Sequence, residues 1–305
     1  MRRRIKITLW TLSGILLAIL ILVNIVGYQK GKEMVTFPMD VREPLTQTPA
    51  DYGMSYEEVN VTTEDGLTLA GWYVRSDNGA AILAMHGYKN DREDPLREAM
   101  YLHRHGYGVL IGSLRTHDVN PGELITFGLQ EMRDFEAWYQ FLLTREDVDP
   151  QKIGIYGKSM GGALSIKYAV QNPGIKAVIA DSAFARMQDT VEKAIVSLLG
   201  EEFRFMTPLI VFWGERIAGI QAAEVNTTEW ISRLCGRPVM LFQGGADELI
   251  PVNSGKRLYD AACEPKSLWY EPQASHTICD LPELEMECEQ RIVSFFDENV
   301  LGEHE

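Results

Sequence analysis

The sequence of 305 residues lacks the common patterns that bind metal ions or nucleotides. It has no His-Glu-x-x-His, no Cys-x-x-Cys, no histidine pair at ligand spacing and no glycine-rich loop that would cradle phosphate. We therefore expect no metal and no other cofactor. Basic residues are few, since 29 Lys and Arg stand against 43 Asp and Glu, and they form no basic stripe. Nucleic acid is therefore not an expected partner.

The N-terminal residues differ in kind from the rest of the chain. Four basic residues within the first six precede Ile7–Val26, a mostly apolar run of 20 residues that is long enough to span a bilayer as a helix. A cleaved signal peptide would have a shorter apolar core and a small-x-small cleavage site, and no Ala-x-Ala is present. We predict an uncleaved transmembrane signal anchor within residues 1–33. The positive-inside rule then predicts a single-pass protein of the cell membrane whose remaining residues are extracytoplasmic.

Composition divides the remaining chain into a linker, a core and an insertion. Residues 34–55 are polar, contain three prolines and are predicted to be a linker. Residues 56–182 and 238–300 are predicted to form the core, and residues 183–237 are predicted to be a small helical cap inserted into it. Beyond residue 33 there are 23 basic and 42 acidic residues, a net charge of −19, which we interpret as a solvated surface.

The core shows a hairpin followed by alternating strand and helix patterns. Val59–Thr62 and Leu67–Val74 flank an Asp-Gly turn and alternate in polarity, as hairpin strands do. Further strands are predicted at Ala80–Met85, Tyr107–Ile111, Ile153–Tyr156, Ile175–Ala180, Val239–Phe242 and Ser267–Tyr270. Helices are predicted at Leu96–His105, Leu129–Leu142, Ser254–Ala262 and Pro282–Asn299. This order predicts an α/β fold with a mostly parallel sheet covered by helices on both faces.

The stretch Lys152–Ala169 carries the strongest chemical signal. It runs from an apolar strand through Gly-Lys-Ser-Met-Gly at residues 157–161 into helix-forming residues. Between a strand and a helix, the G-x-S-x-G pattern forms a strained turn that projects the serine above the sheet, and flanking Gly157 and Gly161 allow it. Ser159 is thus a candidate nucleophile; the alternative is a serine that only caps the helix. Lys158 is interpreted as a solvated side chain.

Together these motifs resemble the serine hydrolases of the α/β-hydrolase fold. The nearest branch is the bacterial prolyl-oligopeptidase-like and serine-aminopeptidase-like one, whose members often have an N-terminal membrane anchor. The resemblance covers about Tyr56–Val300. It rests on Asp65-Gly66-Leu67, His86-Gly87, Thr126-Phe127-Gly128 with Glu131 and Asp134, Gly157-Lys158-Ser159-Met160-Gly161-Gly162, Gly244 with Asp247 and Pro251, and Ser275-His276. The order Ser, Asp, His is the one this fold uses.

The resemblance implies a role for each site residue. Ser159 would attack a carbonyl with His276 as general base, although His276 could instead be an ordinary loop histidine. The backbone N–H groups of Tyr88 and Met160 would form the oxyanion hole. The acid that orients His276 could be Asp181 or Asp247. Asp247 is favoured because the glycines before it allow a sharp turn, whereas Asp181 precedes the insertion, where an Asp often caps a turn.

One loop departs from the pattern of the relatives. They usually have Asp-x-Arg-Gly-His-Gly-x-Ser after the fourth strand, where this chain has Ser-Leu-Arg-Thr-His-Asp-Val-Asn at residues 113–120. Arg115 and His117 are kept, while both glycines and the leading Asp are lost. Because this loop braces the site in relatives and does no chemistry, the change bears on loop geometry more than on activity.

The four cysteines leave two alternatives open. Cys235 lies three residues before Pro238 and Cys263 three before Lys266, each at the head of a strand, and these strands are expected to be parallel neighbours about 4.8 Å apart. They could therefore form a disulfide in an oxidising exterior. The alternative is four free thiols, which include Cys279 and Cys288.

The function predicted from the sequence is that of a membrane-tethered serine hydrolase. It would cleave small-molecule esters, or amide and peptide bonds, through an acyl-enzyme, and its partner besides the substrate would be the membrane. Aromatic and aliphatic residues of the insertion would either accept an acyl or aromatic group or simply pack against the core. The rival is a catalytically silent α/β-hydrolase domain that serves as a tethered binding or scaffold protein.

Overall fold

A single sheet of eight strands organises the computed structural model, which describes residues 2–302, with side chains from Trp10 onwards. The strands are β1 Glu57–Thr62, β2 Thr68–Val74, β3 Ala81–Met85, β4 Gly108–Gly112, β5 Ile153–Lys158, β6 Ile175–Asp181, β7 Val239–Gly244 and β8 Lys266–Glu271. Their order is β1-β2-β4-β3-β5-β6-β7-β8. β2 is antiparallel to both β1 and β4, and all other neighbours are parallel. The carboxyl ends of six parallel strands therefore meet at one edge of the sheet.

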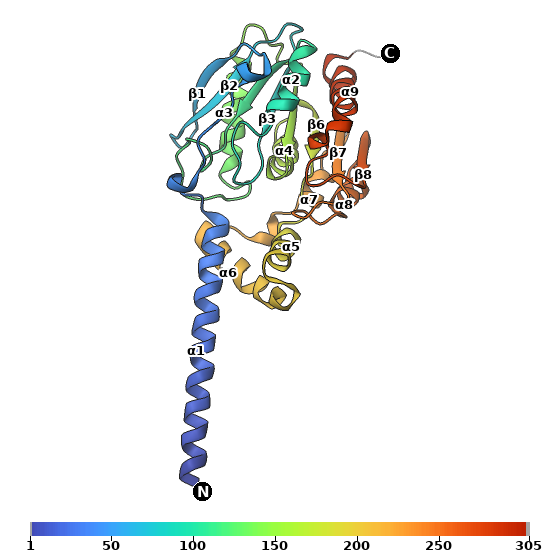
Figure 1. Ribbon diagram of the computed structural model, residues 1–305. Coiled ribbons are helices and arrows are strands. Elements are labelled where there is room, and N and C mark those ends of the chain that lie inside the picture. The colour runs from blue at the N-terminus through green and yellow to red at the C-terminus, as the bar shows by residue number, and fades with distance from the viewer. Residues whose placement is uncertain (1, 303–305) are drawn as a thin grey trace.

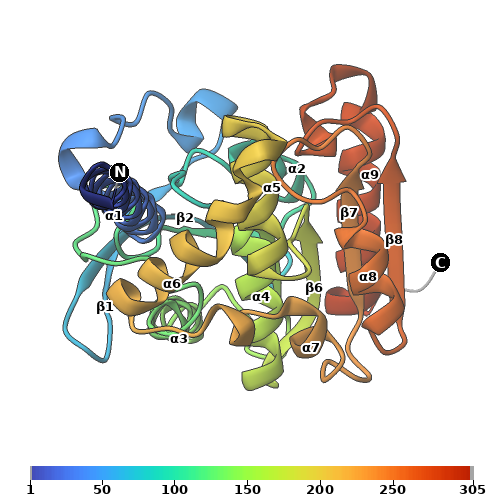
Figure 2. The ribbon, with the colours of Figure 1, turned by 90° about the horizontal axis from the view of Figure 1, so that it is seen from below.

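Helices cover both faces of this sheet (Figures 1 and 2). One face packs against α2 Leu96–Arg104 and α9 Glu285–Phe296, and the other against α3 Glu131–Leu143, α4 Met160–Gln171 and α8 Ser254–Ala261. The central strands are buried throughout because helices on both sides exclude water from them. The predicted α/β-hydrolase fold is confirmed.

The N-terminal helix α1, Arg2–Val35, projects away from the core (Figure 1). From Trp10 to Val35 it is apolar and long enough to cross a membrane, and almost all of it is exposed. The chain after α1 lies along the core: the guanidinium of Arg42 donates hydrogen bonds to the carbonyl oxygens of Asp118 (3.1 Å) and Asn120 (2.7 Å). Short 3-10 helices at Met39–Val41 and Pro49–Tyr52 interrupt this segment.

Residues 183–237 are helical, and the greater part of them lies below the core in Figure 1, while the last helix lies beside α8. They form α5 Met187–Leu199, α6 Thr207–Ala218 and α7 Thr227–Ile231, with 3-10 helices at Glu201–Met206 and Ala222–Glu224. Helix α6 packs closely along α1. A Cβ added at Gly31 would lie 2.7 Å from the carbonyl oxygen of Ile210, so this approach requires glycine.

Two disulfides link the cysteines, so of the two alternatives the bridged one is observed. Cys235 and Cys263, at the entrances to β7 and β8, are paired with their Cα atoms 4.9 Å apart. A second bridge, between Cys279 and Cys288, was not predicted; it joins the loop after β8 to α9 with a Cα separation of 5.7 Å. Nothing in the sequence indicated this bridge, because neither Cys279 nor Cys288 lies at the entrance to a strand.

Candidate active site

Ser159 stands at the junction of β5 and α4 in a strained backbone conformation. Its φ is 51° and its ψ is −114°, a region that L-residues seldom occupy. The chains pass so closely here that a Cβ at Gly157 would lie 2.4 Å from the carbonyl oxygen of Gly161. A Cβ at Gly161 would lie 2.4 Å from the carbonyl oxygen of His86. Both glycines are thus sterically required, and the turn lifts Ser159 to the carboxyl edge of the sheet.

His276 and Asp247 come together at the same edge. His276 lies in the loop after β8, and its Nδ1 is 2.9 Å from Oδ2 of Asp247, which follows β7. The Asp247 side chain is fully buried, and its other oxygen accepts hydrogen bonds from the backbone N–H groups of Leu249 and Ile250, both at 2.8 Å. Three donors therefore fix this carboxylate, and the carboxylate fixes the imidazole.

The end of β6 holds Ser159 and His276 near one another. The N–H of Ser159 donates to the carbonyl oxygen of Asp181 at 2.7 Å. The hydroxyl of Ser182, the next residue, donates to the backbone carbonyl of His276. In the described part of the chain, the Ser159 hydroxyl and the His276 ring form no hydrogen bond with each other; such bonds often tighten only when substrate binds.

Two opposing effects act on the pKa of His276. Burial disfavours the charged imidazolium and lowers the pKa, whereas the hydrogen bond and the negative charge of Asp247 raise it. The charges of Asp181 and Asp94 add to the raising effect, and the pKa ends above its ordinary value of 6.5. The imidazole is therefore poised to accept a proton and to hold it beside Asp247.

Asp181, the alternative acid, points elsewhere. Its carboxylate accepts hydrogen bonds from the hydroxyls of Tyr156 and Ser182, both at 2.9 Å. Burial raises its pKa to about 6 despite the nearby ammonium of Lys158. The imidazole of His276 thus has Asp247 as its hydrogen-bonded carboxylate, and Asp181 braces the loop that carries Ser182.

Two backbone N–H groups beside Ser159 have no hydrogen-bond acceptor among the described residues. Met160 is the first residue of α4, and the N–H groups of a helix start have no partner within the helix. Among the described residues, none accepts a hydrogen bond from the N–H of Tyr88. Gly87 lies against Ser159, since a Cβ added there would be 3.4 Å from that of the serine. Its N–H donates to Asp94 at 2.8 Å, which fixes the loop.

The Tyr88 side chain turns away from the serine and contacts α1. Its ring stacks on Phe127 with 5.7 Å between the centroids, and its hydroxyl donates to the carbonyl oxygen of Met34 at 2.7 Å. The ammonium of Lys89 donates to the carbonyl oxygen of Glu33 at 2.7 Å. The last turn of α1 therefore contacts the loop that follows β3.

The interpretation of Lys158 as a solvated side chain is wrong. Lys158 is buried, its ammonium lies 3.0 Å from Glu98 and it donates to the carbonyl oxygen of Asp94 at 2.8 Å. Although burial by itself lowers the pKa of Lys158, the surrounding carboxylates raise it, so it is charged. Lys158 is buried because both faces of β5 are covered by helices, and its side chain lies on the face that packs against α2, where Glu98 supplies the countercharge.

The loop at residues 113–120 keeps a glycine-like shape without the glycines. Thr116 and Asp118, at the two positions where relatives have glycine, have φ of 64° and 51°. Each costs about 1–2 kcal/mol in this conformation. The surroundings offset this cost: Asp118 pairs with Arg92 at 2.7 Å, and Asn120 accepts a hydrogen bond from the N–H of Ala70 at 2.7 Å. The altered sequence thus retains the turn.

Other sites offer less for chemistry. Glu98, Asp181 and Cys279 place possible metal-ligand atoms within 4.8 Å of one another, but the Cys279 sulfur is in a disulfide and the Lys158 ammonium occupies the face of Glu98. These residues do not fit a metal ion.

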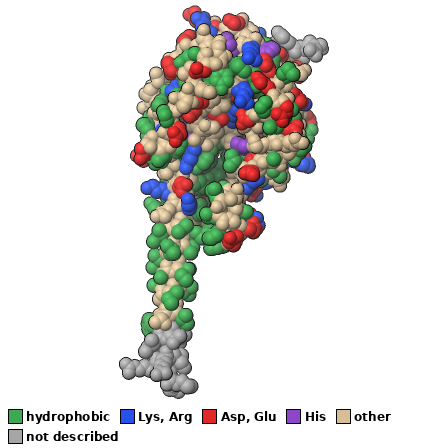
Figure 3. All heavy atoms as spheres, in the orientation of Figure 1, with side chains coloured by type: hydrophobic (Ala, Val, Ile, Leu, Met, Phe, Trp, Pro, Cys, Tyr) green, Lys and Arg blue, Asp and Glu red, His purple; other side chains and the backbone are tan. Residues whose placement is uncertain are grey.

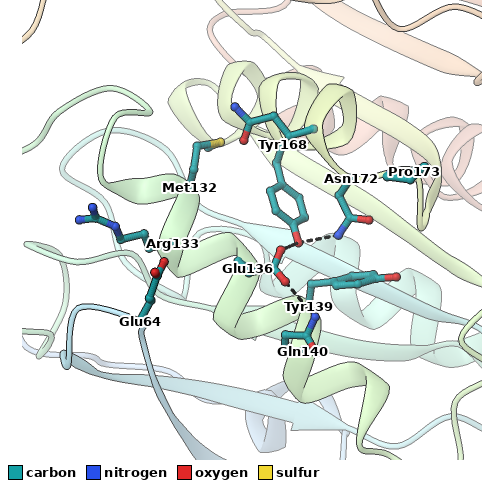
Figure 4. A pocket seen from close by; sticks show the side chains of 10 residues that line it. Glu64, Met132, Arg133, Glu136, Tyr139, Gln140, Tyr168, Asn172 and Pro173 are labelled. Carbon is teal, nitrogen blue, oxygen red and sulfur yellow. Dashed lines mark hydrogen bonds between the residues drawn. The ribbon is translucent and has the colours of Figure 1, made fainter.

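A pocket between α3 and α4 (Figure 4) is lined mainly by polar side chains that form hydrogen bonds with one another. Tyr168 bonds Glu136 and Asn172, both at 2.7 Å. Tyr168 lies roughly 13 Å along α4 from Ser159, at about 1.5 Å per residue, so this pocket is separate.

Comparison with known proteins agrees with this fold. Solved structures that resemble the chain include an esterase of Pyrococcus furiosus, with a TM-score of 0.73, 24% identity and coverage of 88% of this chain and 98% of that one. They also include an acylaminoacyl peptidase of Pyrococcus horikoshii, with a TM-score of 0.64, 17% identity and coverage of 83% of this chain and 43% of that one. Together with the family matches below, they make the chain a serine hydrolase of the α/β-hydrolase fold.

The particular family follows from the sequence. Residues 126–303 match the prolyl oligopeptidase family and residues 50–198 match the X-Pro dipeptidyl-peptidase (S15) family; the chain belongs to the prolyl oligopeptidase family. An uncharacterized protein of Mycobacterium tuberculosis, Rv2307c, is 29% identical over 82% of this chain and 81% of its own length. Protein bem46 of Schizosaccharomyces pombe is 23% identical over 82% and 81%.

Sequence reasoning missed several residues that brace the site. Ser182 holds the carbonyl of His276, and its φ of 53° shows a strained turn that no local signal announces. Lys193 on α5 donates to the carbonyl oxygens of Asp247 (2.6 Å) and Ile250 (3.1 Å), which ties the insertion to the acid's loop. These contacts join segments far apart in the chain, so spacing in the sequence carries no trace of them.

Proposed function

We propose that this protein is a membrane-anchored serine hydrolase that cleaves esters, or related amide and peptide bonds, through an acyl-enzyme. The observation that carries the proposal is the buried Asp247 carboxylate held 2.9 Å from Nδ1 of His276, at the sheet edge where Ser159 stands in a strained turn. This is the constellation that acyl transfer requires: a nucleophile, a base and a group that orients the base.

Each proposed step follows from the position of the groups. His276 Nε2 takes the proton of the Ser159 hydroxyl as the oxygen bonds to the substrate carbonyl carbon, and Asp247 stabilises the imidazolium. The N–H groups of Met160 and Tyr88 stabilise the negative oxygen that forms, a contribution of about 2.7–4 kcal/mol for each donor in a related site. His276 then protonates the leaving alcohol or amine. Water then attacks the acyl carbon while His276 takes its proton, and His276 returns that proton to the Ser159 oxygen as the bond to the acyl group breaks and the acid leaves.

The membrane part of the proposal rests on α1 and the cysteines. Trp10–Val35 has the length and composition of a spanning helix, and few of its side chains are buried. Two disulfides support an oxidising compartment for the core. Protease added to intact spheroplasts should therefore digest the core, while protection until lysis would contradict the outward orientation.

The rival proposal, a silent scaffold, has less to support it. It rested on the altered loop at residues 113–120, and that loop keeps the positive φ values at Thr116 and Asp118. A fluorophosphonate probe, which reacts with activated serines, separates the two. The enzyme predicts labelling of the natural protein and none of Ser159→Ala; absence of labelling in folded natural protein supports the scaffold.

The substrate class needs a second measurement. A panel of p-nitrophenyl esters of rising chain length, assayed beside aminoacyl and peptidyl amides, would rank ester against amide cleavage. We expect esters to be turned over faster than amides. Preferential cleavage of the amides would assign the site to peptides.

A further inference from the structure

Helix α1 indicates at which level of the bilayer the insertion that packs against it would lie. Val23 and Val26 of α1 contact a small apolar cluster formed by Ile195, Met206 and Ile210. Both valines fall within the run Ile7–Val26, whose 20 residues match the thickness of a bilayer's hydrocarbon core, about 30 Å. Side chains at this level of α1 are therefore at the outer boundary of the hydrocarbon.

The aromatic contacts at this level are those of a membrane interface. The indole N–H of Trp213 on α6 donates to the side-chain oxygen of Asn24 at 3.1 Å, and Tyr28 meets the Trp213 ring edge-on at 5.3 Å. Tryptophan and tyrosine concentrate where hydrocarbon meets headgroups because they combine an apolar ring with a polar tip.

The lower edge of the insertion exposes large apolar side chains at the same place. Leu198 is 81% exposed and Phe205 is 65% exposed. We call these residues, with their exposed neighbours, the apolar edge: Leu198, Leu199, Phe203, Phe205 and Phe212. Figure 3 shows apolar side chains covering α1 up to the point where the insertion meets it. Large apolar side chains exposed together on one short segment indicate a binding surface.

The charged residues of the edge are partly paired. Arg204, between Phe203 and Phe205, pairs with Glu201 at 3.0 Å and with Glu192 at 3.2 Å. Pairing lowers the cost of bringing these groups to a surface of low dielectric. Glu202 lies beside them, so three glutamates face one arginine and the fringe of the edge is acidic. An acidic fringe with aromatic rings suits an uncharged or zwitterionic lipid surface better than an anionic one.

We propose that the apolar edge enters the outer leaflet of the bilayer that α1 spans, and that the active site takes acyl esters resident in that leaflet. This rests on the proposed function. Helix α5 links the two parts: its Lys193 is bonded to the backbone of Asp247 and Ile250, and Leu198 of the apolar edge lies five residues further along the same helix. Five residues correspond to about 7.5 Å along a helix, so the apolar edge lies close to the point where α5 binds the loop of Asp247.

Photo-crosslinking in vesicles of zwitterionic lipid tests the position of the edge. The full chain is prepared with p-benzoylphenylalanine in place of Phe205, of Leu17 within the span, or of Met286. Met286 is 84% exposed and belongs to α9, a helix that lies well above α5 and α6 in Figure 1. We expect lipid adducts at Leu17 and Phe205 and none at Met286.

The other outcomes overturn the proposal. Adducts of twice the chain mass at Phe205 would show a second copy on the edge, and adducts to another protein would show a protein partner. Adducts at Leu17 alone would place the edge in water. Fluorophosphonate labelling of Ser159 in the same vesicles reports on the proposed function independently: normal labelling without lipid adducts at Phe205 refutes only the membrane contact.

Turnover tests the substrate class. The double variant Phe203→Asp with Phe205→Asp should lose at least about tenfold of its activity toward a long-chain diacylglycerol in the vesicles, while p-nitrophenyl acetate in solution is cleaved as before. Met286→Asp is the matched control and should change neither rate. Equal losses toward both esters in the double variant would refute the delivery of substrate from the bilayer.

Discussion

The hydroxyl of Tyr88 donates a hydrogen bond to the backbone carbonyl of Met34, 2.7 Å away, and thereby joins the loop after β3 to the end of α1. The last carbonyls of a helix lack partners within the helix. Here Lys89 supplies one for Glu33 at 2.7 Å, and the N–H of Ile125 supplies one for Val35 at 2.9 Å. The helix that would anchor the protein is therefore part of the structure around Ser159.

This contact predicts that Tyr88→Phe slows turnover while leaving the fold intact. The substitution keeps the backbone N–H proposed for the oxyanion hole and removes only the bond to Met34. Losing a neutral hydrogen bond of about 1 kcal/mol would reduce kcat by roughly fivefold if it loosens the loop. Tyr52→Phe, whose hydroxyl bonds Gln47 at 2.9 Å away from the site, is the control. Equal kcat values in Tyr88→Phe and the natural enzyme would show that the hydrogen bond to α1 does not affect catalysis.

The two candidate acids should differ sharply on substitution. Asp247→Asn removes the charge that orients and stabilises the His276 imidazolium, and the corresponding change in a serine protease costs about 10⁴ in kcat. Asp181→Asn should cost far less, because Asp181 bonds Tyr156 and Ser182 and leaves the ring of His276 to Asp247. Steady-state kinetics on both folded variants would decide which carboxylate serves His276. A larger loss in Asp181→Asn would reverse the assignment.

The pH profile should report the raised pKa of His276. Only neutral imidazole can accept the proton of Ser159, so kcat/KM should rise with pH through an apparent pKa above 6.5. In Asp247→Asn, burial of His276 remains, but the hydrogen bond to a carboxylate and its negative charge, which raise the pKa of His276, are lost. The acidic limb of the kcat/KM profile should therefore move to lower pH. The folded state correspondingly favours protonated His276, a stabilisation that is complete below about pH 6.5 and lost as pH rises through the folded pKa. If the acidic limb of the profile lies at the same pH in Asp247→Asn as in the natural enzyme, Asp247 does not raise the pKa of His276.

The sequence predicts the fold and the principal site residues because these depend on local patterns. The glycines at residues 157 and 161 signal a steric requirement that any chain must meet at such a turn, and apolar runs mark buried strands. Lys158 shows where this reasoning fails. Its burial depends on Glu98 from another helix, and a pairing across 60 residues leaves no periodic trace. Ser182 and the contact of α1 with Tyr88 are hidden for the same reason.

The disulfides predict a chain without free thiols in protein taken from the outer surface. Peptide mapping without reductant should find Cys235 joined to Cys263 and Cys279 joined to Cys288. Replacing Cys235 and Cys263 together by serine should lower the free energy of unfolding by about 3 kcal/mol, as for a closed loop of this size. Four alkylatable thiols would rule out both bridges.

The final prediction concerns Arg115, the residue that the altered loop retains. Its buried guanidinium binds Asp134 at 2.7 Å and Asp65 at 2.8 Å, and Asp134 is itself fully buried. Arg115→Met would leave that carboxylate without a countercharge and should reduce the free energy of unfolding by about 3–5 kcal/mol. Arg133 offers a matched control, since it pairs with the same Asp65 at 3.1 Å but is exposed. Because surface pairs contribute little, Arg133→Met should cost less than about 1 kcal/mol. Denaturant unfolding of both variants measures the difference, and equal costs would show that the loop at residues 113–120 does not depend on the buried pair.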